Sequence, residues 1–91
     1  MTAVRIPPVL RAQAGSNKQV EVTGATVGEA LASLIEQFPG LRDQLLTGDG
    51  SLNRFVNIYV NGRDVRYEQE LDTPVGAADT VILLPAMAGG R

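Results

Sequence analysis

The chain has 91 residues, 44% of them hydrophobic and 20% charged, with a formal net charge of −2. This length allows one domain with a single core, and the composition is that of a folded globule rather than a disordered chain. Lysine and arginine do not cluster, so we expect no nucleic-acid partner. The chain lacks cysteine and histidine, which excludes thiolate nucleophiles, imidazole bases, disulfides and the usual zinc ligands. We therefore expect neither catalytic residues nor a metal site.

Nothing in the sequence indicates secretion or membrane insertion. Residues 1–8 lack the apolar region of a signal peptide, and no apolar run reaches the length of about 18 residues that a bilayer requires. The absence of cysteine is compatible with the cytosol. We expect a cytoplasmic protein that has no membrane partner.

The first elements are predicted to be two strands. Val4 and Ile6 fall at alternate positions, the pattern of a half-buried strand, and Pro7-Pro8 ends it. Residues 9–18 contain turn-forming residues and are predicted to be a link. Residues 19–23 alternate again between valine and polar side chains, which predicts the second strand.

A helix is predicted from its cap onward. The segment Thr26-Val27-Gly28-Glu29 fits a capping box, in which the threonine hydroxyl and the glutamate carboxylate accept from backbone N–H groups of the first turn. Pro39-Gly40 ends the helix. Between these signals, one apolar stripe faces a core, and it consists of Val27, Ala30, Leu31, Leu34, Ile35 and Phe38.

The second half of the chain is predicted to begin with a short helix at residues 41–46 and a polar loop at 47–51. Residues 55–60 are rich in strand-forming side chains. Asn61-Gly62 follows, the pair that a two-residue type I′ turn favours because both positions need a positive φ. Residues 63–67 then return as a short partner strand.

A final strand is predicted at residues 80–84, so that one helix covers one face of a mixed sheet in an α+β fold. Side chains alternate along strands, which assigns the faces. Val56, Ile58, Val60, Val81 and Leu83 are predicted to point toward the helix. Phe55, Asn57, Tyr59, Ile82 and Leu84 are predicted to point away from it.

The face that the helix leaves uncovered is a candidate docking surface, because apolar side chains that gather on one exposed face often contact a partner. Ile82 and Leu84 are the strongest candidates since they adjoin the C-terminal tail. The remaining members of the predicted partner-binding surface are Phe55, Tyr59 and Met87. Arg54, Arg63 and Arg66 either rim this surface and meet an acidic partner or are simply solvated.

The chain ends in a tail of small residues behind a proline-broken apolar strand, Leu84-Pro85-Ala86-Met87-Ala88-Gly89-Gly90-Arg91. This ending and the order of elements resemble the MoaD/ThiS family of ubiquitin-like sulfur carriers. The resemblance implies a β-grasp fold, a mixed sheet of four to five strands packed on one main helix, in a domain of residues 1–84 with a tail of residues 85–91. The CysO branch is the most similar, through residues 7–11, 26–29, 54–61, 64–66 and 82–90.

The resemblance also implies a chemistry. An E1-like activating enzyme uses ATP to adenylate the carboxylate of Gly90, and a sulfur donor then replaces AMP to leave a thiocarboxylate. Ala88, Gly89 and Gly90 would enter the partner's active site, which glycines suit because they lack a Cβ. A cysteine-synthase-like enzyme is the acceptor implied by the CysO branch. The carrier itself is then not an enzyme and binds no cofactor, since the activating enzyme uses the ATP.

Arg91 departs from the family's ending, because it places a charged side chain where the terminal glycine belongs. We expect Gly90 to be the working end. Gly90 and Arg91 then form the processing site, where a metalloprotease removes Arg91, unless Arg91 is an artificial addition.

Three other functions stay open. A ubiquitin-like modifier would be joined to target lysines through Gly90. A permanent small subunit, as in a molybdopterin-synthase-type complex, would insert its tail into a larger synthase. A β-grasp interaction domain without tail chemistry would retain full function after loss of Gly89 and Gly90.

Overall fold

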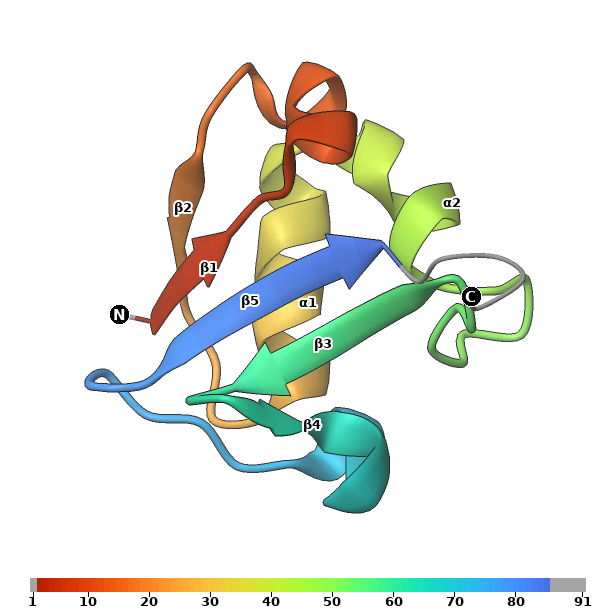
Figure 1. Cartoon of the computed structure of the whole chain (residues 1–91). Helices are drawn as coiled ribbons and strands as arrows, with labels where there is room; N and C mark the ends of the chain where they lie inside the picture. The colour runs from red at the N-terminus through yellow and green to blue at the C-terminus, as the bar shows by residue number, and fades with distance from the viewer. Residues whose placement is uncertain (1, 86–91) are drawn as a thin grey trace.

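Five strands form one mixed sheet in the computed structural model, which describes residues 2–85 (Figure 1). The strand order is β2-β1-β5-β3-β4. β5 runs parallel to β1 and antiparallel to β3, so the last strand of the chain is the middle strand of the sheet. The predicted α+β fold is confirmed. The strands are β1 (Thr2–Arg5), β2 (Gln19–Val22), β3 (Val56–Val60), β4 (Arg63–Asp64) and β5 (Thr80–Pro85).

The main helix, α1 (Val27–Gln37), begins at the predicted cap. The Thr26 hydroxyl accepts from the Glu29 N–H at 3.2 Å, as expected. The Glu29 carboxylate instead accepts from the N–H of Ala25, which precedes the helix, at 2.8 Å. The prediction that this carboxylate accepts from the first turn was wrong. In that turn, the Val27 N–H already donates to the carbonyl of Thr73, which is distant in sequence, at 2.9 Å.

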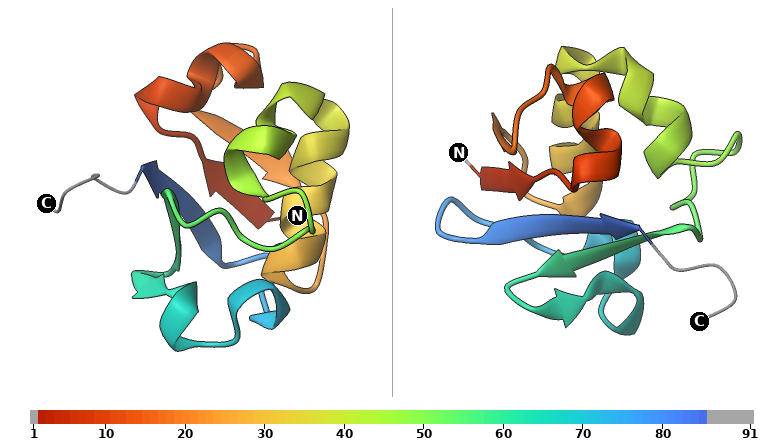
Figure 2. Two further views of the ribbon diagram at one scale, coloured as in Figure 1. Left: turned by 90° about the vertical axis from the view of Figure 1, so that its right-hand side faces the viewer. Right: turned by 45° about the horizontal axis from the view of Figure 1, so that its top comes forward.

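The core lies between α1 and one face of the sheet, and Figure 2 shows these two layers from the side. Four members of the predicted helix stripe are buried, whereas Ile35 and Phe38 are partly buried at its edge. The sheet contributes the side chains that were predicted to point inward. Those side chains are Val56, Ile58, Val60, Val81 and Leu83, and all of them are buried. The face assignment is therefore confirmed.

The link between β1 and β2 differs from the prediction, because it contains the 3-10 helix η1 (Pro8–Ala14). Pro8 occupies its first turn, where the missing N–H of proline is tolerated. Leu10 and Ala14 are buried, so η1 caps the end of the core. The chain then reverses at Gly15 and Ser16, both with positive φ.

The predicted strand at residues 63–67 is shorter than expected. β4 contains only Arg63 and Asp64, and the chain continues as the 3-10 helix η3 (Val65–Tyr67). The Asp64 carboxylate accepts from the Arg66 N–H at 2.9 Å, which favours the turn over a continued strand. The turn before β4 is as predicted, with Asn61 and Gly62 at φ 52° and 87°.

The remaining helices are short. They are η2 (Pro39–Leu41), the predicted short helix α2 (Arg42–Leu45) and η4 (Glu70–Asp72). None of the helices within residues 2–85 is long and apolar enough to cross a membrane.

Candidate functional site

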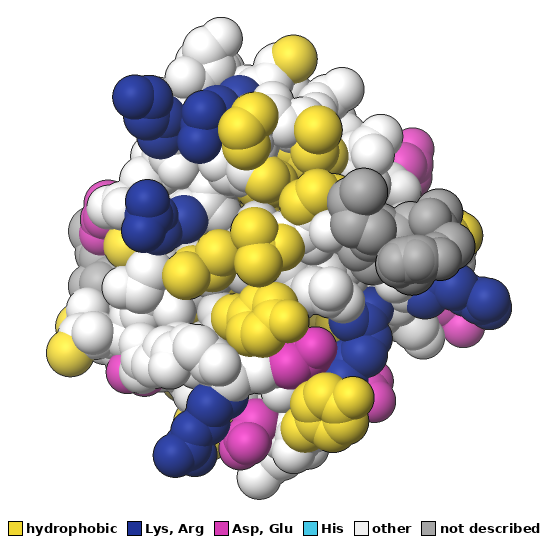
Figure 3. Space-filling view, viewed as in Figure 1, with side chains coloured by type: hydrophobic (Ala, Val, Ile, Leu, Met, Phe, Trp, Pro, Cys, Tyr) yellow, Lys and Arg dark blue, Asp and Glu magenta, His cyan; other side chains and the backbone are white. Residues whose placement is uncertain are grey.

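The sheet face opposite α1 is open, and Figure 3 looks directly onto it. One cross-strand row shows how the five strands assemble this face. Across the sheet, the row runs Gln19, Arg5, Ile82, Tyr59 and Asp64, each opposite the next in register. Gln19 and Arg5 are exposed and the other three are partly exposed, so the row is a surface feature. The face is therefore polar at its two edges and apolar over β5 and β3.

The predicted docking residues gather around β5. Ile82 lies opposite Tyr59, and Leu84 lies opposite Asn57. Leu84 is 42% exposed and Phe55 60%, and Figure 3 shows hydrophobic side chains grouped over the middle of the face. Phe55 immediately precedes Val56, which faces Pro85 at the end of β5. Two of these four predicted side chains, Ile82 and Leu84, thus belong to the strand that leads to the tail, and Tyr59 and Phe55 come from β3 and the residue before it.

The predicted residues Met87, Ala88, Gly89, Gly90 and Arg91 lie outside residues 2–85, which the structure describes. The last described strand pairs one residue further than predicted, since Pro85 belongs to β5 and lies opposite Val56. The tail therefore follows a strand that is paired on both sides up to Ile82 and with β3 up to Pro85.

Arg66 does not serve as a free cation on the rim. Its guanidinium donates to the Asn57 side chain at 2.7 Å and to the carbonyls of Asn53 and Val56 at 3.0 and 2.9 Å. These bonds fasten η3 to the start of β3. Arg54 and Arg63 are exposed, as predicted for rim or solvated side chains.

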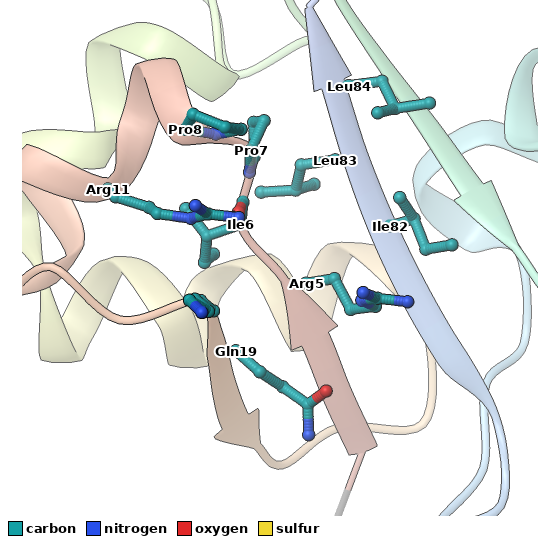
Figure 4. Close-up of a pocket in the computed structure, with 10 residues that line it drawn as sticks. Arg5, Ile6, Pro7, Pro8, Arg11, Gln19, Ile82, Leu83 and Leu84 are labelled. Carbon is teal, nitrogen blue, oxygen red and sulfur yellow. The ribbon is translucent and has the colours of Figure 1, made fainter.

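A groove that the sequence did not reveal lies between β5 and the end of β1, on the side of β5 away from β3 (Figure 4). It has a volume of about 260 Å³ and separates the end of β5 from the β1–η1 junction. Its lining consists of Arg5, Ile6, Pro7, Pro8, Arg11, Lys18, Gln19, Ile82, Leu83 and Leu84. No local motif joins these residues, because they come together through the parallel pairing of β1 with β5.

The shifted pKa values in the described chain are caused by hydrogen bonds to exposed carboxylates. The Asn61 side chain and the Gly76 N–H donate to the Asp79 carboxylate and hold its pKa below its usual range. Asp49 has a lowered pKa for a similar reason, since the Thr47 hydroxyl donates to it. Residues 2–85 contain no group of three or more acidic side chains placed to hold a metal ion.

The sequence matches the model of the ThiS family over residues 4–90. It is 42% identical over 89 residues to the sulfur carrier protein CysO of Mycobacterium tuberculosis, with 96% of each chain covered. A chain in the crystal structure of the Amycolatopsis orientalis BexX/CysO complex superposes with a TM-score of 0.90 at 40% identity, covering 99% of this chain and 100% of that one. Small archaeal modifier protein 3 of Haloferax volcanii is 38% identical over 66 residues, 72% of this chain and 71% of that protein.

Proposed function

The chain belongs to the ThiS family, with the ubiquitin-like β-grasp fold, and on that basis we propose that it is a sulfur carrier whose Gly90 carboxylate becomes a thiocarboxylate. The observation that carries the proposal is the extent of the family match, which ends on Gly90. The relative from Mycobacterium tuberculosis is a sulfur carrier protein. A chain without cysteine or histidine suits that role, because the carrier contributes only a carboxylate.

The proposed chemistry consists of two substitutions, the first at the α-phosphorus of ATP and the second at the carbonyl carbon of Gly90. A Gly90 carboxylate oxygen first attacks the α-phosphorus of ATP, and pyrophosphate leaves, which gives an acyl adenylate. Hydrosulfide then attacks the acyl carbon, and AMP leaves with that oxygen. The product is a thiocarboxylate, and neither step needs an oxidant or a reductant. The ATP and the catalytic groups belong to an E1-like enzyme.

The position of β5 supports these separate roles of the carrier and the enzyme. Val81 and Leu83 are fully buried and anchor the strand, while Ile82 and Leu84 remain on the outer face. A partner can therefore dock on a rigid globule while the tail enters its active site. From Pro85 to Gly90 an extended tail reaches about 20 Å, at about 3.3 Å per residue.

The partners follow from the same chemistry. The E1-like enzyme charges Gly90, and an enzyme of the cysteine-synthase class takes up the sulfur onto an activated serine, which makes cysteine the proposed end product. Arg91 must first be removed, because its bulky, charged side chain at the terminal carboxylate would keep the tail from fitting an active site that takes glycine. A metalloprotease that hydrolyses the Gly90–Arg91 bond is the proposed processing enzyme.

The proposal is tested by the mass of the intact protein. The chain ending at Gly90 is incubated with ATP, hydrosulfide and an E1-like enzyme that charges a CysO-type carrier. We expect a gain equal to the mass difference between sulfur and oxygen. The matched controls end at Arg91 and at Ala88, and neither should gain sulfur. If the chain ending at Gly90 gains nothing while that carrier is charged beside it, the proposal fails.

A ubiquitin-like modifier is the second candidate, favoured by the similarity to a small archaeal modifier protein. It requires the same adenylate, but an amine of a target lysine replaces AMP and forms an isopeptide bond. Adducts linked through Gly90 in a cell lysate would support the modifier over the carrier. Stable copurification with one large synthase would instead support a permanent small subunit.

A further inference from the structure

We propose that the groove between η1 and the end of β5 receives an acidic segment of the enzyme that takes up the tail. The inference rests on the proposed function, since it assumes that an enzyme covers this end of the molecule. The groove would be a second contact beside the apolar open face. In this contact, carboxylates of the partner lie over the cations of the groove, and an apolar side chain of the partner lies on its floor.

The charge of the groove is opposite to that of the chain. Arg5, Arg11 and Lys18 line it, and among the described residues that line it there is no carboxylate. The chain as a whole carries a net charge of −2. The Glu21 carboxylate of β2 accepts from the side chain of Gln19, a groove residue, at 3.4 Å, but Glu21 itself does not line the groove. Figure 3 shows Lys and Arg side chains grouped along one border of the hydrophobic patch. This border is complementary to an acidic partner.

Arg11 is held in place at the groove. Its Nε donates to the Ile6 carbonyl at 3.0 Å, and Figure 4 shows the side chain beside Ile6. Within residues 2–85 this is the one hydrogen bond that its side chain makes, so the two terminal nitrogens remain available. A guanidinium oriented in this way is suited to bind a carboxylate through two parallel hydrogen bonds.

The floor of the groove is apolar. Ile6 and Leu83 are buried beneath it, whereas Pro8 and Leu84 are exposed at its edge. Phosphates of a nucleic acid would leave these side chains uncovered, but a peptide with alternating acidic and apolar residues would cover both features. The groove also adjoins Leu84, which precedes Pro85 and the tail, so an enzyme that takes up the tail lies against it.

The test is a titration of the ¹⁵N-labelled full chain, followed by NMR. The probe is the hexapeptide acetyl-Asp-Leu-Glu-Asp-Leu-Glu-amide, and its uncharged match is acetyl-Asn-Leu-Gln-Asn-Leu-Gln-amide. We expect the acidic peptide to shift the amide signals of Arg5, Ile6, Arg11, Lys18, Leu83 and Leu84, and the uncharged peptide to leave them in place. Shifts centred on Arg54 and Arg63 instead would overturn the inference, as would no shift.

Two double variants distinguish the effect of the groove cations on peptide binding from the effect of net charge alone. We expect Arg5→Glu/Lys18→Glu to weaken binding of the acidic peptide about tenfold, because two attractions become repulsions. Arg42→Glu/Arg63→Glu makes the same change in net charge at exposed residues outside the groove, and we expect an effect of about twofold or less. Equal weakening by both would overturn the inference. So would equal shifts of the groove signals by hexathymidylate, which would indicate a general anion site.

The outcome of the titration does not depend on the outcome of the sulfur-transfer test. The titration does not read the tail chemistry, so a chain that gains no sulfur can still show the groove shifts. A wild-type chain that gains sulfur but shows no groove shifts overturns the acidic contact alone.

Discussion

Leu84 lies directly opposite Asn57 across the β5–β3 pairing, although one side chain is apolar and the other polar. On its β3 side, Leu84 thus meets an amide that Arg66 holds at 2.7 Å. On its other side it lines the groove with Pro7 and Pro8. Leu84, like Ile82, therefore belongs to both the open face and the groove, and it lies at the point where the tail begins.

Neighbouring residues of β5 are expected to respond in opposite ways to truncation. Leu83 is fully buried, so we expect Leu83→Ala to lower the free energy of unfolding by about 2–5 kcal/mol. Leu84 is 42% exposed, so Leu84→Ala should change it by about 0.5 kcal/mol or less while slowing sulfur loading of Gly90. Urea unfolding and intact-mass kinetics measure the two effects. A Leu84→Ala chain that is loaded at the wild-type rate would remove Leu84 from the docking surface.

Arg66 is expected to stabilise the fold, unlike its exposed neighbour Arg63. Its three hydrogen bonds join η3 to the start of β3, and we expect Arg66→Ala to lower the free energy of unfolding by about 1–3 kcal/mol. Arg66→Lys should restore little of this, because an ammonium group lacks the planar fork of a guanidinium. Arg63→Ala is the control, with an expected change within about 0.5 kcal/mol. Equal stability of the two alanine variants would contradict this role.

Gly24 is expected to tolerate no side chain. Its φ is 147°, and an added Cβ would lie 2.7 Å from the Ala30 nitrogen, in the backbone of α1. We expect Gly24→Ala to destabilise the protein by about 1–3 kcal/mol or more, since helix backbone cannot move aside cheaply. Gly48→Ala is the matched control, because nothing lies within 4 Å of its added Cβ. Thermal unfolding compares the two variants, and a similar loss in both would refute the steric explanation.

The Asp79 carboxylate is expected to make stability depend on pH in the acid range. Hydrogen bonds from Asn61 and Gly76 lower its pKa in the folded chain below the usual value near 3.8. The carboxylate therefore stabilises the fold above pH 3.8, and this contribution disappears as the pH falls through the lowered value. The difference in stability between wild type and Asp79→Ala should be largest near neutrality and shrink in that window.

The same pKa can be followed directly by the ¹³C signal of the Asp79 carboxyl group. Asn61→Gly removes the side-chain donor but keeps a residue that accepts the positive φ of 52°. We expect the Asp79 pKa to rise toward its usual value in this variant. An unchanged titration would show that Asn61 is not the main cause of the shift.

The elements whose causes are local follow from the sequence alone. The cap at Thr26, the helix stripe, the Asn61-Gly62 turn and the alternation along β3 and β5 each depend on residues a few positions apart. Local spacing sets which side chains share a face, and the chain's resemblance to a family set the expected chemistry at Gly90. The local features were therefore predictable, apart from one hydrogen bond of Glu29 and the ends of β4 and β5, whereas the chemistry at Gly90 stays a prediction.

Which distant residues meet depends on the packing of the whole chain. Arg5 lies opposite Ile82 because β1 pairs in parallel with β5, and that pairing depends on the burial of the whole sheet rather than on any local pattern. The groove follows from this pairing and from η1, which the sequence did not reveal. The role of Arg66 was also out of reach, since its three acceptors become neighbours only after η3 packs against β3. Non-local contacts of this kind depend on the free energy of the complete fold, which no short segment encodes.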